Sequence, residues 1–367
     1  MSDAAVKVPL APASADDSGP ASLGSSCPLP ITQQEQIVLG HGSGGKLSAQ
    51  LIESVFLPAF NNPTLNKLDD QALLQINGSR LAFTTDAFVV TPLFFPGGDI
   101  GRLAINGTVN DLAMSGARPL YLAAAFILEE GLAIDELRRI VQSMSESARD
   151  AGVQLVAGDT KVVNRGKGDK IFISTTGIGV IEKPVNISAD RAAPGDKIIL
   201  SGHIGDHGMA ILSQRESLEF EGVIESDCAA LHGLVRDMIE VSLDIHVLRD
   251  PTRGGVATVL NEIAQRSKTG MVLRETDIPV RETVRGACEI LGLDPMYVAN
   301  EGKLVAMVPA KDADAVVACM REDPLGRDAR VIGEVVREHP GMVLMQTEIG
   351  GTRVVDTLFG EQLPRIC

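Results

Sequence analysis

Two hydrophobic periods alternate along this chain, and they constrain its fold more than any other feature of the sequence. Between Ala133 and Ala151, apolar residues recur at the spacing of one face of an amphipathic helix. Val153 to Ala157 and Ile171 to Ile181 are instead rich in β-branched residues, and the second run alternates with Thr and Gly as a sheet strand does. A fresh strand at Lys197 to Leu200 follows. We therefore predict sheets mixed with helices, the α+β class.

The character of the chain changes at Glu182-Lys183-Pro184, and its 367 residues suit two domains of typical size. We predict a disordered leader at 1–36, α+β domains at 37–184 and 185–355, and a mobile tail at 356–367. The leader mixes Ala, Ser, Pro and Asp without the apolar run of a signal peptide. In the second domain we expect helices near 205–214, 228–243, 255–266 and 280–291, and strands at 304–308, 331–335 and 342–345.

Composition argues against several classes of partner. The formal charge of -15 and the pI near 4.9 disfavour a nucleic-acid backbone or an anionic membrane. No apolar run approaches the roughly 18 to 20 residues that span a bilayer. The cysteines are odd in number, scattered and never in a C-x-x-C pair, which speaks against a disulfide framework or a zinc site and for a reducing cytoplasm. They are Cys27, Cys228, Cys288, Cys319 and Cys367.

The last residue of the chain is a cysteine, Cys367. Chain ends are usually mobile, so a thiol here can be carried between sites. The α-carboxylate of Cys367 disfavours its thiolate, and Arg365 offsets this only in part. A reactive role would therefore need an activated partner or a site that receives the thiol, and the other interpretation is a frayed end.

A glycine-rich segment, Gly40 to Lys46, nearly matches a phosphate-binding P-loop, and Ile37 to Leu39 could form the preceding strand. The match fails at Leu47, where a hydroxyl should hold magnesium. Glycine backbone can still cradle phosphate oxygens. The segment is either such a phosphate-binding flap or a flexible loop.

Carboxylates recur at the ends of apolar runs that look like strands. We expect these strand-end carboxylates to converge on one magnesium-nucleotide cleft, because magnesium binds a few carboxylates together with phosphates and water. For any single carboxylate, a turn or a helix cap is the competing role. These aspartates are Asp69, Asp70, Asp86, Asp111 and Asp159. His203 and His207 stand four residues apart, but with no third clustered ligand we expect loop or helix-cap roles for them.

Taken together, the motifs of the chain resemble the family of the nickel-iron hydrogenase maturation protein HypE, the carbamoyl dehydratase. The resemblance covers about Ile37 to Cys367, and the ending Pro-Arg-Ile-Cys separates this family from relatives such as aminoimidazole ribonucleotide synthetase, selenophosphate synthetase and thiamine-monophosphate kinase. The segments that support it are 41–46, 85–90, 92–101, 109–117, 158–163, 250–255 and 364–367.

The resemblance implies two domains of the aminoimidazole ribonucleotide synthetase type, a homodimer formed through the N-terminal domains, and a cleft for ATP and Mg²⁺. It also implies that the carbamoyltransferase HypF loads a carbamoyl group onto Cys367. ATP-dependent dehydration would then give a thiocyanate, and its cyanide would pass to iron on a HypC-HypD scaffold complex.

The resemblance assigns roles to individual residues. Cys367 would be the acceptor, Lys161 would neutralise charge on the transferred phosphoryl group, and Glu301 would take the amide proton. The nucleotide would be held by Gly42, Ser43, Gly44, Gly45, Asp69, Asp70, Asp86, Asn110, Asp111 and Asp159. The metal ligands would be Asp70, Asp86, Asp111 and Asp250.

Two other functions stay open at this point. A metal chaperone could use Cys367 with His41 to carry iron or nickel. A sister ATP-dependent ligase or kinase is the nearer alternative, and it predicts turnover without Cys367.

Overall fold

The computed structural model describes residues 36–218, 222–360 and 366–367. From Val38 onward the chain forms one compact unit. The predicted leader, apart from its last residue, lies outside the described residues, and so do residues 361–365 of the predicted tail. No helix in the described part of the chain is long and apolar enough to cross a membrane.

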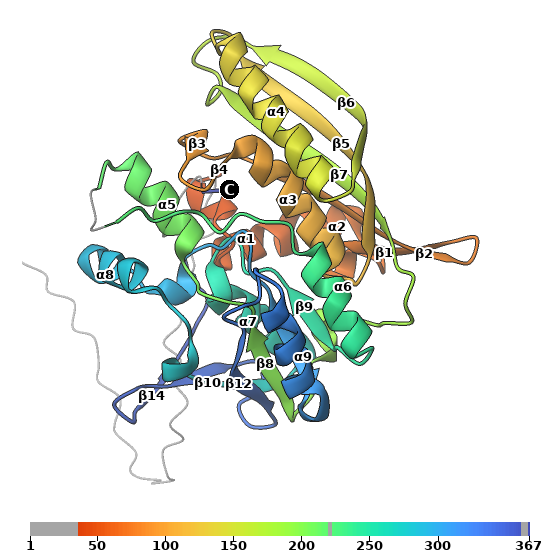
Figure 1. Ribbon diagram of the computed structural model, residues 1–367, viewed down its shortest axis with the longest axis vertical. Helices are drawn as coiled ribbons and strands as arrows, with labels where there is room; N and C mark the ends of the chain where they lie inside the picture. Colours follow the sequence, from red (N-terminus) through yellow and green to blue (C-terminus); the bar gives the residue numbers. More distant parts are fainter. Residues whose placement is uncertain (1–35, 219–221, 361–365) are drawn as a thin grey trace, which may run out of the picture. The chain divides into compact units, whose positions relative to one another are not determined.

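The N-terminal half forms a five-stranded sheet in the order β1-β2-β7-β5-β6, in which β5 and β6 run parallel and the other neighbours antiparallel (Figure 1). Helix α3 (Ile100–Ala113) packs on β2 and β7, and α4 (Ile134–Asp150) packs against α3. Asp99 caps α3 by accepting two backbone N–H groups. The strands are β1 (Ala72–Ile76), β2 (Ser79–Phe88), β5 (Arg118–Glu129), β6 (Gln154–Val163) and β7 (Ile171–Val180).

The two faces of this sheet differ. Ile171 and Ile173 of β7 are buried, and α3 packs on the same strand. On the outer face, Ile178 stands directly opposite Phe83 on one side and Tyr121 on the other, and all three side chains are exposed. Because paired residues of neighbouring strands point to the same face, these three form an apolar row that the described part of the chain leaves exposed.

The C-terminal half forms a seven-stranded sheet in the order β14-β13-β10-β12-β8-β11-β9. Its strands are β8 (Asp196–Leu200), β9 (Val247–Arg249), β10 (Gly270–Arg274), β11 (Val305–Pro309), β12 (Arg330–Val336), β13 (Val343–Gln346) and β14 (Thr352–Val354). Its helices are α5 (Asp206–Arg215), α6 (His232–Val241), α7 (Gly255–Ser267), α8 (Glu282–Leu291) and α9 (Ala310–Glu322). The short elements of the N-terminal half are α1 (Lys46–Leu51), α2 (Leu57–Phe60), β3 (Phe94–Phe95) and β4 (Gly98–Asp99).

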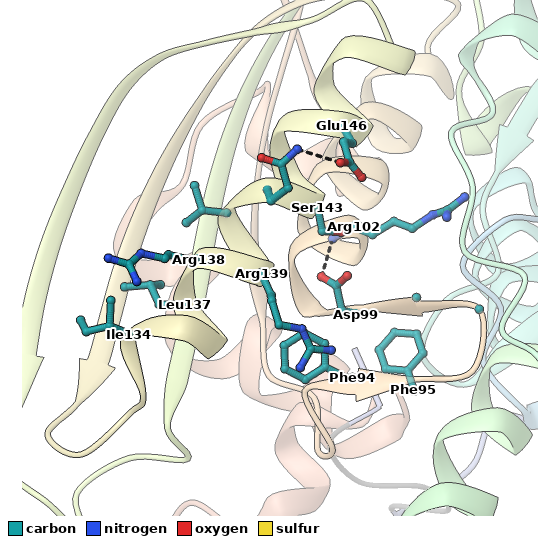
Figure 2. A pocket seen from close by; sticks show the side chains of 14 residues that line it. Phe94, Phe95, Asp99, Arg102, Ile134, Leu137, Arg138, Arg139, Ser143 and Glu146 are labelled. Carbon is teal, nitrogen blue, oxygen red and sulfur yellow. Dashed lines mark hydrogen bonds between the residues drawn. The ribbon is translucent and has the colours of Figure 1, made fainter.

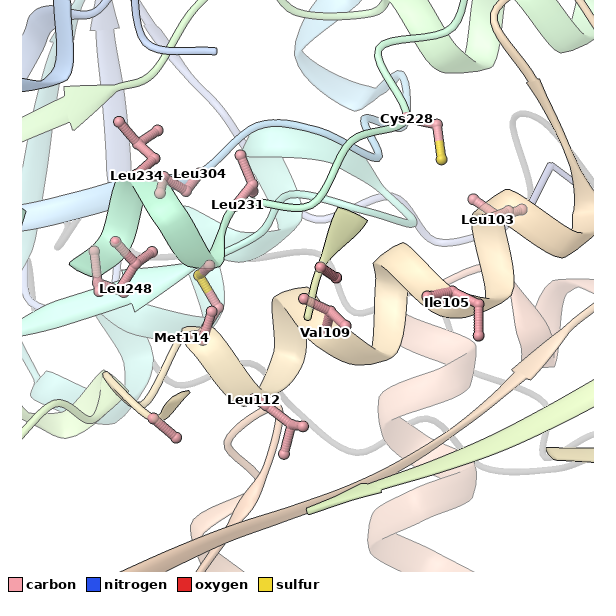
Figure 3. Close-up of a cluster of buried hydrophobic side chains, with 14 of the residues drawn as sticks. Leu103, Ile105, Val109, Leu112, Met114, Cys228, Leu231, Leu234, Leu248 and Leu304 are labelled. Carbon is pink, nitrogen blue, oxygen red and sulfur yellow. The ribbon is translucent and has the colours of Figure 1, made fainter. Parts of the chain in front are cut away.

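A single buried cluster joins the two halves. Val109 of α3 and Met114, which follows α3, belong to the same cluster as Leu231, Leu248 and Leu304 of the C-terminal half (Figure 3). Burial of large aliphatic side chains on both sides holds α3 firmly against the second half. The position of α3 relative to the second half is therefore fixed by packing. The domain boundary near Pro184 stays a prediction.

Several expectations about elements need correction. Ile37 to Leu39 is not a strand, because residues 39–42 form a 3-10 turn. Asp111 does not end a strand; it lies in α3, where Val109, Leu112 and Ala113 belong to the core face. The helix expected from 228 begins only at His232. The amphipathic helix α4, by contrast, lies within one residue of its predicted bounds.

Candidate functional site

Three carboxylates meet where the two halves face each other. Oxygen atoms of Asp70, Asp111 and Asp250 lie within 4.8 Å of one another. They come from three parts of the chain: the loop before β1, helix α3, and the residue after β9. Asp86 of β2 lies close by and lines the same small cavity as Asp111 and Asp250. The structure thus brings together all four predicted metal ligands.

Few partners neutralise this acidic cluster. Thr84 donates its hydroxyl to Asp111 at 2.8 Å, and Thr108 donates to Asp86 at 3.3 Å. Arg249 lies 2.7 Å from Asp70 and is shared with Glu262. Buried carboxylates are otherwise costly unless they are paired or bind a metal ion.

Burial shapes the protonation of the cluster. It raises the pKa of Asp70 and of Asp111 well above the ordinary value, with repulsion from neighbouring carboxylates adding to the effect. Burial also raises the pKa of Asp250 to about 6, although Arg249 acts in the opposite direction. Oxygen ligands crowded in this way suit a hard divalent cation, because its charge would offset both the burial and the repulsion.

The end of the chain lies in this site. Val89 donates its N–H to the carbonyl of Cys367 at 3.1 Å, and Ile366 forms an antiparallel bridge with Val90. A cavity of about 40 Å³ adjoins the thiol of Cys367 and is lined by Asp86, Asp111, Asp250, Arg253 and Glu301 among others. For Cys367 the structure shows an inward position, and the flexibility of the tail stays a prediction.

Glu301 lies beside the thiol, as its predicted role requires. Its backbone N–H donates to Asp227 at 3.0 Å, which fixes the peptide, while its carboxylate is buried. Burial, with repulsion from Asp250 and Asp227, raises the pKa of Glu301 well above its usual value. Burial and the Glu301 carboxylate together raise the pKa of Cys367 to about 12, so the docked thiol is neutral.

The glycine-rich segment lies against the C-terminal half. Arg253 donates to the carbonyl of Gly42 at 3.1 Å, and Lys46 donates its backbone N–H to Leu358 at 2.8 Å. Gly44 has φ +77°, and a Cβ on Gly45 would lie 2.5 Å from the Leu358 carbonyl oxygen. Only glycine fits this conformation and this close approach.

Two predicted ligands have structural contacts of their own. Asn110 donates to the Ala229 carbonyl at 3.0 Å and accepts from the Leu231 N–H at 2.7 Å, so it ties α3 to the segment before α6. Asp69 accepts from the Ser188 hydroxyl at 3.0 Å and from a backbone N–H beside it. Their nucleotide-binding roles stay predictions.

Asp159 and Lys161 do not join the cluster within one chain. Asp86 pairs with Thr175, whose side chain is buried, whereas Asp159 is in register with Ser174 across β5. Successive strand residues point to opposite faces, so Asp159 and Lys161 lie on the outer face of the sheet. There they pair with each other at 2.5 Å, about two thirds exposed. The expectation that Asp159 converges with the other aspartates is wrong for a single chain, and Lys161 lies in a strand and not in a loop.

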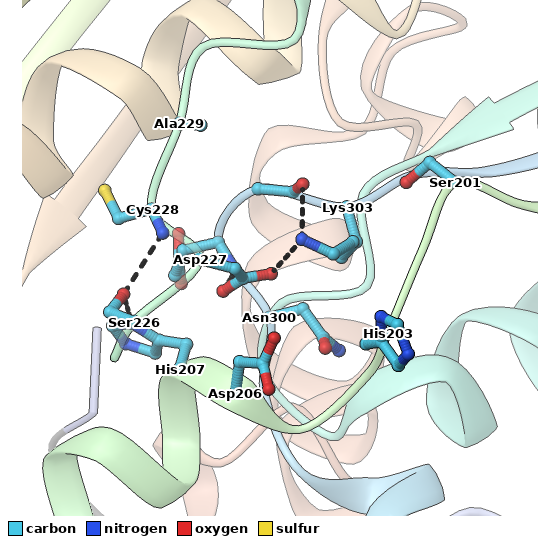
Figure 4. A network of polar contacts seen from close by, with 12 residues as sticks. Ser201, His203, Asp206, His207, Ser226, Asp227, Cys228, Ala229, Asn300 and Lys303 are labelled. Carbon is cyan, nitrogen blue, oxygen red and sulfur yellow. Dashed lines mark hydrogen bonds and ion pairs between the residues drawn. The ribbon is translucent and has the colours of Figure 1, made fainter. Parts of the chain in front are cut away.

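Two larger cavities in the described part of the chain lie away from the thiol. A groove of about 1160 Å³ runs between the β3–β4 hairpin and α4, where Arg139 stacks 3.9 Å above the ring of Phe94 (Figure 2). The second, of about 420 Å³, is lined by Asp206, Asp227 and Lys303 (Figure 4). Neither contains an acidic cluster with Cys367.

Arg253, Thr84 and Thr108 had no predicted role, and His207 was expected only in a loop or at a helix cap. His207 is fully buried, and its Nε2 lies 2.5 Å from the carbonyl oxygen of Ile366. Hydroxyl and imidazole groups that serve a site through one hydrogen bond leave no spacing pattern, because their partners are distant in the sequence. Arg253 lies in segment 250–255, one of those that support the family resemblance, and this position could have indicated that Arg253 belongs to the site.

The two-domain arrangement is that of proteins related to AIR synthase. Residues 68–181 match the model of the N-terminal domain of AIR synthase related proteins, and residues 193–344 match the model of the C-terminal domain.

The carbamoyl dehydratase HypE of Cupriavidus necator is 58% identical over 351 residues, which cover 95% of this chain and 100% of that protein. A crystal structure of hydrogenase maturation protein HypE in complex with ATP is 53% identical and has a TM-score of 0.77, covering 90% of this chain and 100% of that one. A HypE-HypF complex has a TM-score of 0.80 at 49% identity, covering 84% and 99%. The chain belongs to the carbamoyl dehydratase HypE family.

Proposed function

We propose that this protein uses ATP to dehydrate a carbamoyl group on the Cys367 thiol to a thiocyanate, which supplies cyanide for the iron of nickel-iron hydrogenase. The observation that supports this most directly is the position of Cys367, whose thiol adjoins a cavity of about 40 Å³ between Glu301 and the acidic cluster. A cavity of this size suits a group of a few heavy atoms. The name and high identity of the relatives point to the same reaction.

The chemistry balances without a redox partner. The carbamoyl oxygen of the thiocarbamate attacks the γ-phosphorus of ATP, and ADP leaves. One N–H proton is lost in this step. The C–O bond then breaks, phosphate departs with the oxygen, and loss of the second N–H proton completes the C≡N bond. Phosphate makes this possible because an unactivated amide oxygen is a poor leaving group.

Glu301 is the proposed proton acceptor. It lines the same small cavity as Cys367. Among the described acidic side chains, Glu301 raises the pKa of the Cys367 thiol more than Asp86 does. Burial raises the pKa of Glu301 itself, which makes its ionised form a stronger base than an exposed glutamate.

We further propose that Asp70, Asp86, Asp111 and Asp250 hold Mg²⁺, whose charge would neutralise that of the nucleotide phosphates. The crowded, buried oxygens are the observation that supports this assignment. ATP binding agrees with the ATP complex of a relative. The backbone of Gly42 to Gly45, held at the edge of the site by Arg253 and Leu358, is suited to contact phosphate.

The partners follow from the same proposal. HypF would be the carbamoyl donor, as the HypE-HypF complex suggests, and HypC-HypD would receive the cyanide. A homodimer would bury the apolar row of Phe83, Ile178 and Tyr121 on the outer sheet face. A cytoplasmic location agrees with four free cysteines among the described residues.

The rival functions have less support. His41 binds the backbone of Val38 through its Nδ1, and the carboxylate trio contains no cysteine or histidine. A chaperone for iron or nickel would favour such softer ligands. A related kinase would transfer phosphate to a separate substrate, so its reaction would not need the Cys367 thiol in the site.

Mass spectrometry of the C-terminal peptide tests the proposal. With HypF, carbamoyl donor and ATP, the peptide should first gain a carbamoyl group and then lose the mass of one water. Cys367→Ala should abolish loading and retain ATP binding. Asp86→Asn should load normally and lose dehydration. Full water loss in Asp86→Asn would refute the metal assignment, and turnover in Cys367→Ala would refute the carrier role.

A further inference from the structure

The last two residues of the chain are held from two directions. On one side they pair with Val89 and Val90, which directly follow β2. On the other side lies His207 of α5, whose Nε2 is 2.5 Å from the carbonyl oxygen of Ile366. His207 has no exposed surface, and its ring packs edge-on against Phe95 with centroids 5.6 Å apart.

The hydrogen bonds around His207 determine which of its nitrogens has the proton. A carbonyl oxygen can only accept, so Nε2–H donates to Ile366. Burial lowers the pKa of His207, which keeps the ring neutral and leaves Nδ1 as an acceptor. The Ser226 hydroxyl, 2.8 Å away, donates to Nδ1 and accepts from the Cys228 N–H at 3.1 Å (Figure 4).

This chain of donors runs in one direction, from the Cys228 backbone through Ser226 and His207 to Ile366. Of these contacts, only the one from His207 Nε2 depends on the docked end of the chain. Departure of Ile366 leaves a buried N–H without an acceptor, which costs free energy and favours return of the tail.

We propose that His207 is a positioning residue that holds the end of the chain in the site and so places the Cys367 thiol beside Glu301. The contact would set the balance between a tail that is loaded outside and a tail that reacts inside. Its catalytic consequence rests on the proposed function, but the docking contact does not. Weakening it should expose the thiol, slow dehydration and leave loading intact, because only dehydration needs the inward position.

Alkylation of Cys367 tests the contact without any assumption about the reaction. Cleavage after Glu361 releases the peptide 362–367, so its modification can be followed by mass spectrometry. His207→Ala should raise the labelling rate about five- to tenfold, the effect of losing one net hydrogen bond. His207→Gln, which can still donate, should lie closer to wild type, and Ser226→Ala should fall between.

His203→Ala is the matched control, because His203 precedes α5 but pairs with Asp328 at 3.2 Å, away from Ile366. It should label as wild type does. Thermal melts of all variants separate docking from general loss of structure, and His207→Gln provides a folded variant if His207→Ala is unstable. Unchanged labelling in both His207 variants, measured on folded protein, would overturn the proposal.

Single-turnover kinetics then test the consequence. In His207→Ala, loading by HypF should match wild type while dehydration of the loaded thiol slows about tenfold, with partial rescue in His207→Gln. Faster labelling with unchanged dehydration would show that docking at His207 does not serve catalysis. If wild-type protein itself never loses water from a loaded tail, the proposed function fails, whereas the labelling result for His207 still stands.

Discussion

At the scale of single residues, the site gathers carboxyl groups that the described residues neutralise only in part. Asp70, Asp111 and Asp250 crowd within 4.8 Å, and Arg249 is divided between Asp70 and Glu262. The raised pKa values follow from burial first and from mutual repulsion second. The cluster therefore costs stability in the nucleotide-free protein and is suited to recover it when a cation binds.

Asp250→Asn should stabilise the nucleotide-free protein at pH 8 by about 1 to 3 kcal/mol, because ionising a buried carboxyl no longer opposes folding. The folded pKa of about 6 lies above the unfolded value, so this carboxyl lowers stability as the pH rises through that window. The gain should shrink as the pH falls from 6 towards the unfolded pKa of 3.8, and it should vanish only below about pH 3, where the group is protonated in both states. Melting curves across this range give the measurement.

The exposed substitution Asp314→Asn on α9 is the control, and it should change stability little at either pH. Asp250→Asn should also lose most of the stabilisation that Mg-ATP gives to the wild type. A variant less stable than wild type at pH 8 would contradict the account of the cluster.

Glu301→Gln should preserve the shape of the site and remove the proton acceptor. We expect normal loading of Cys367, normal ATP binding, and dehydration slower by about 10²- to 10³-fold. Loss of the carboxylate should also lower the pKa of the Cys367 thiol, because Glu301 raises it in the native protein. Single-turnover mass spectrometry measures the rate, and a dehydration rate within about threefold of wild type would exclude Glu301 as the base.

At the scale of elements, some features could be predicted from the sequence and others could not. Helix α4 and strand β7 follow from hydrophobic period alone, because each presents one buried face. Asp111 was misplaced because α3 is apolar on most sides, so its residues resemble a buried strand. The face on which Asp159 lies depends on its register with β5, and register is not visible in a single strand.

The tail offers a test at this scale. Inserting about four flexible residues after Gly360 should slow dehydration more than loading, because only dehydration needs the thiol positioned with a precision of a fraction of an ångström. The bridge between Val90 and Ile366 can still form, but a longer connection costs more entropy to close. Comparing the two single-turnover rates gives the answer, and equal slowing of both steps would count against the inward position as the reactive one.

At the scale of the whole molecule, the outer face of the N-terminal sheet has two features that a single chain does not explain. It holds the apolar row around Tyr121 and also the exposed pair of Asp159 and Lys161. A chain that acts alone leaves Lys161 on the far side of the sheet from Asp86. If Lys161 takes part in the reaction, as the family resemblance implies, a second copy of the chain must bring it to the site.

Mixed dimers test this directly. Lys161→Ala and Cys367→Ala should each be inactive alone, but dimers assembled from both should recover about a quarter of wild-type activity, since half of the dimers are mixed and each has one complete site. The control pair is Asp86→Asn with Cys367→Ala. These two residues line one cavity in one chain, so mixing them should restore nothing. Failure of the first mixture to recover activity would place Lys161 outside the reaction or within its own chain.

The contact between the glycine-rich segment and Leu358 has a consequence for kinetic order. Lys46 is bound to Leu358 through its backbone and to Asp356 through its side chain at 2.6 Å, close to the base of the tail. A movement of the glycine-rich segment on nucleotide binding would therefore also move residues 356–358. The nucleotide diffuses into the site, whereas the loaded thiol is attached to the chain. The binding of one should therefore affect the binding of the other. Steady-state kinetics should therefore show an ordered sequence of addition, with the nucleotide and the loaded thiol each altering the apparent affinity for the other.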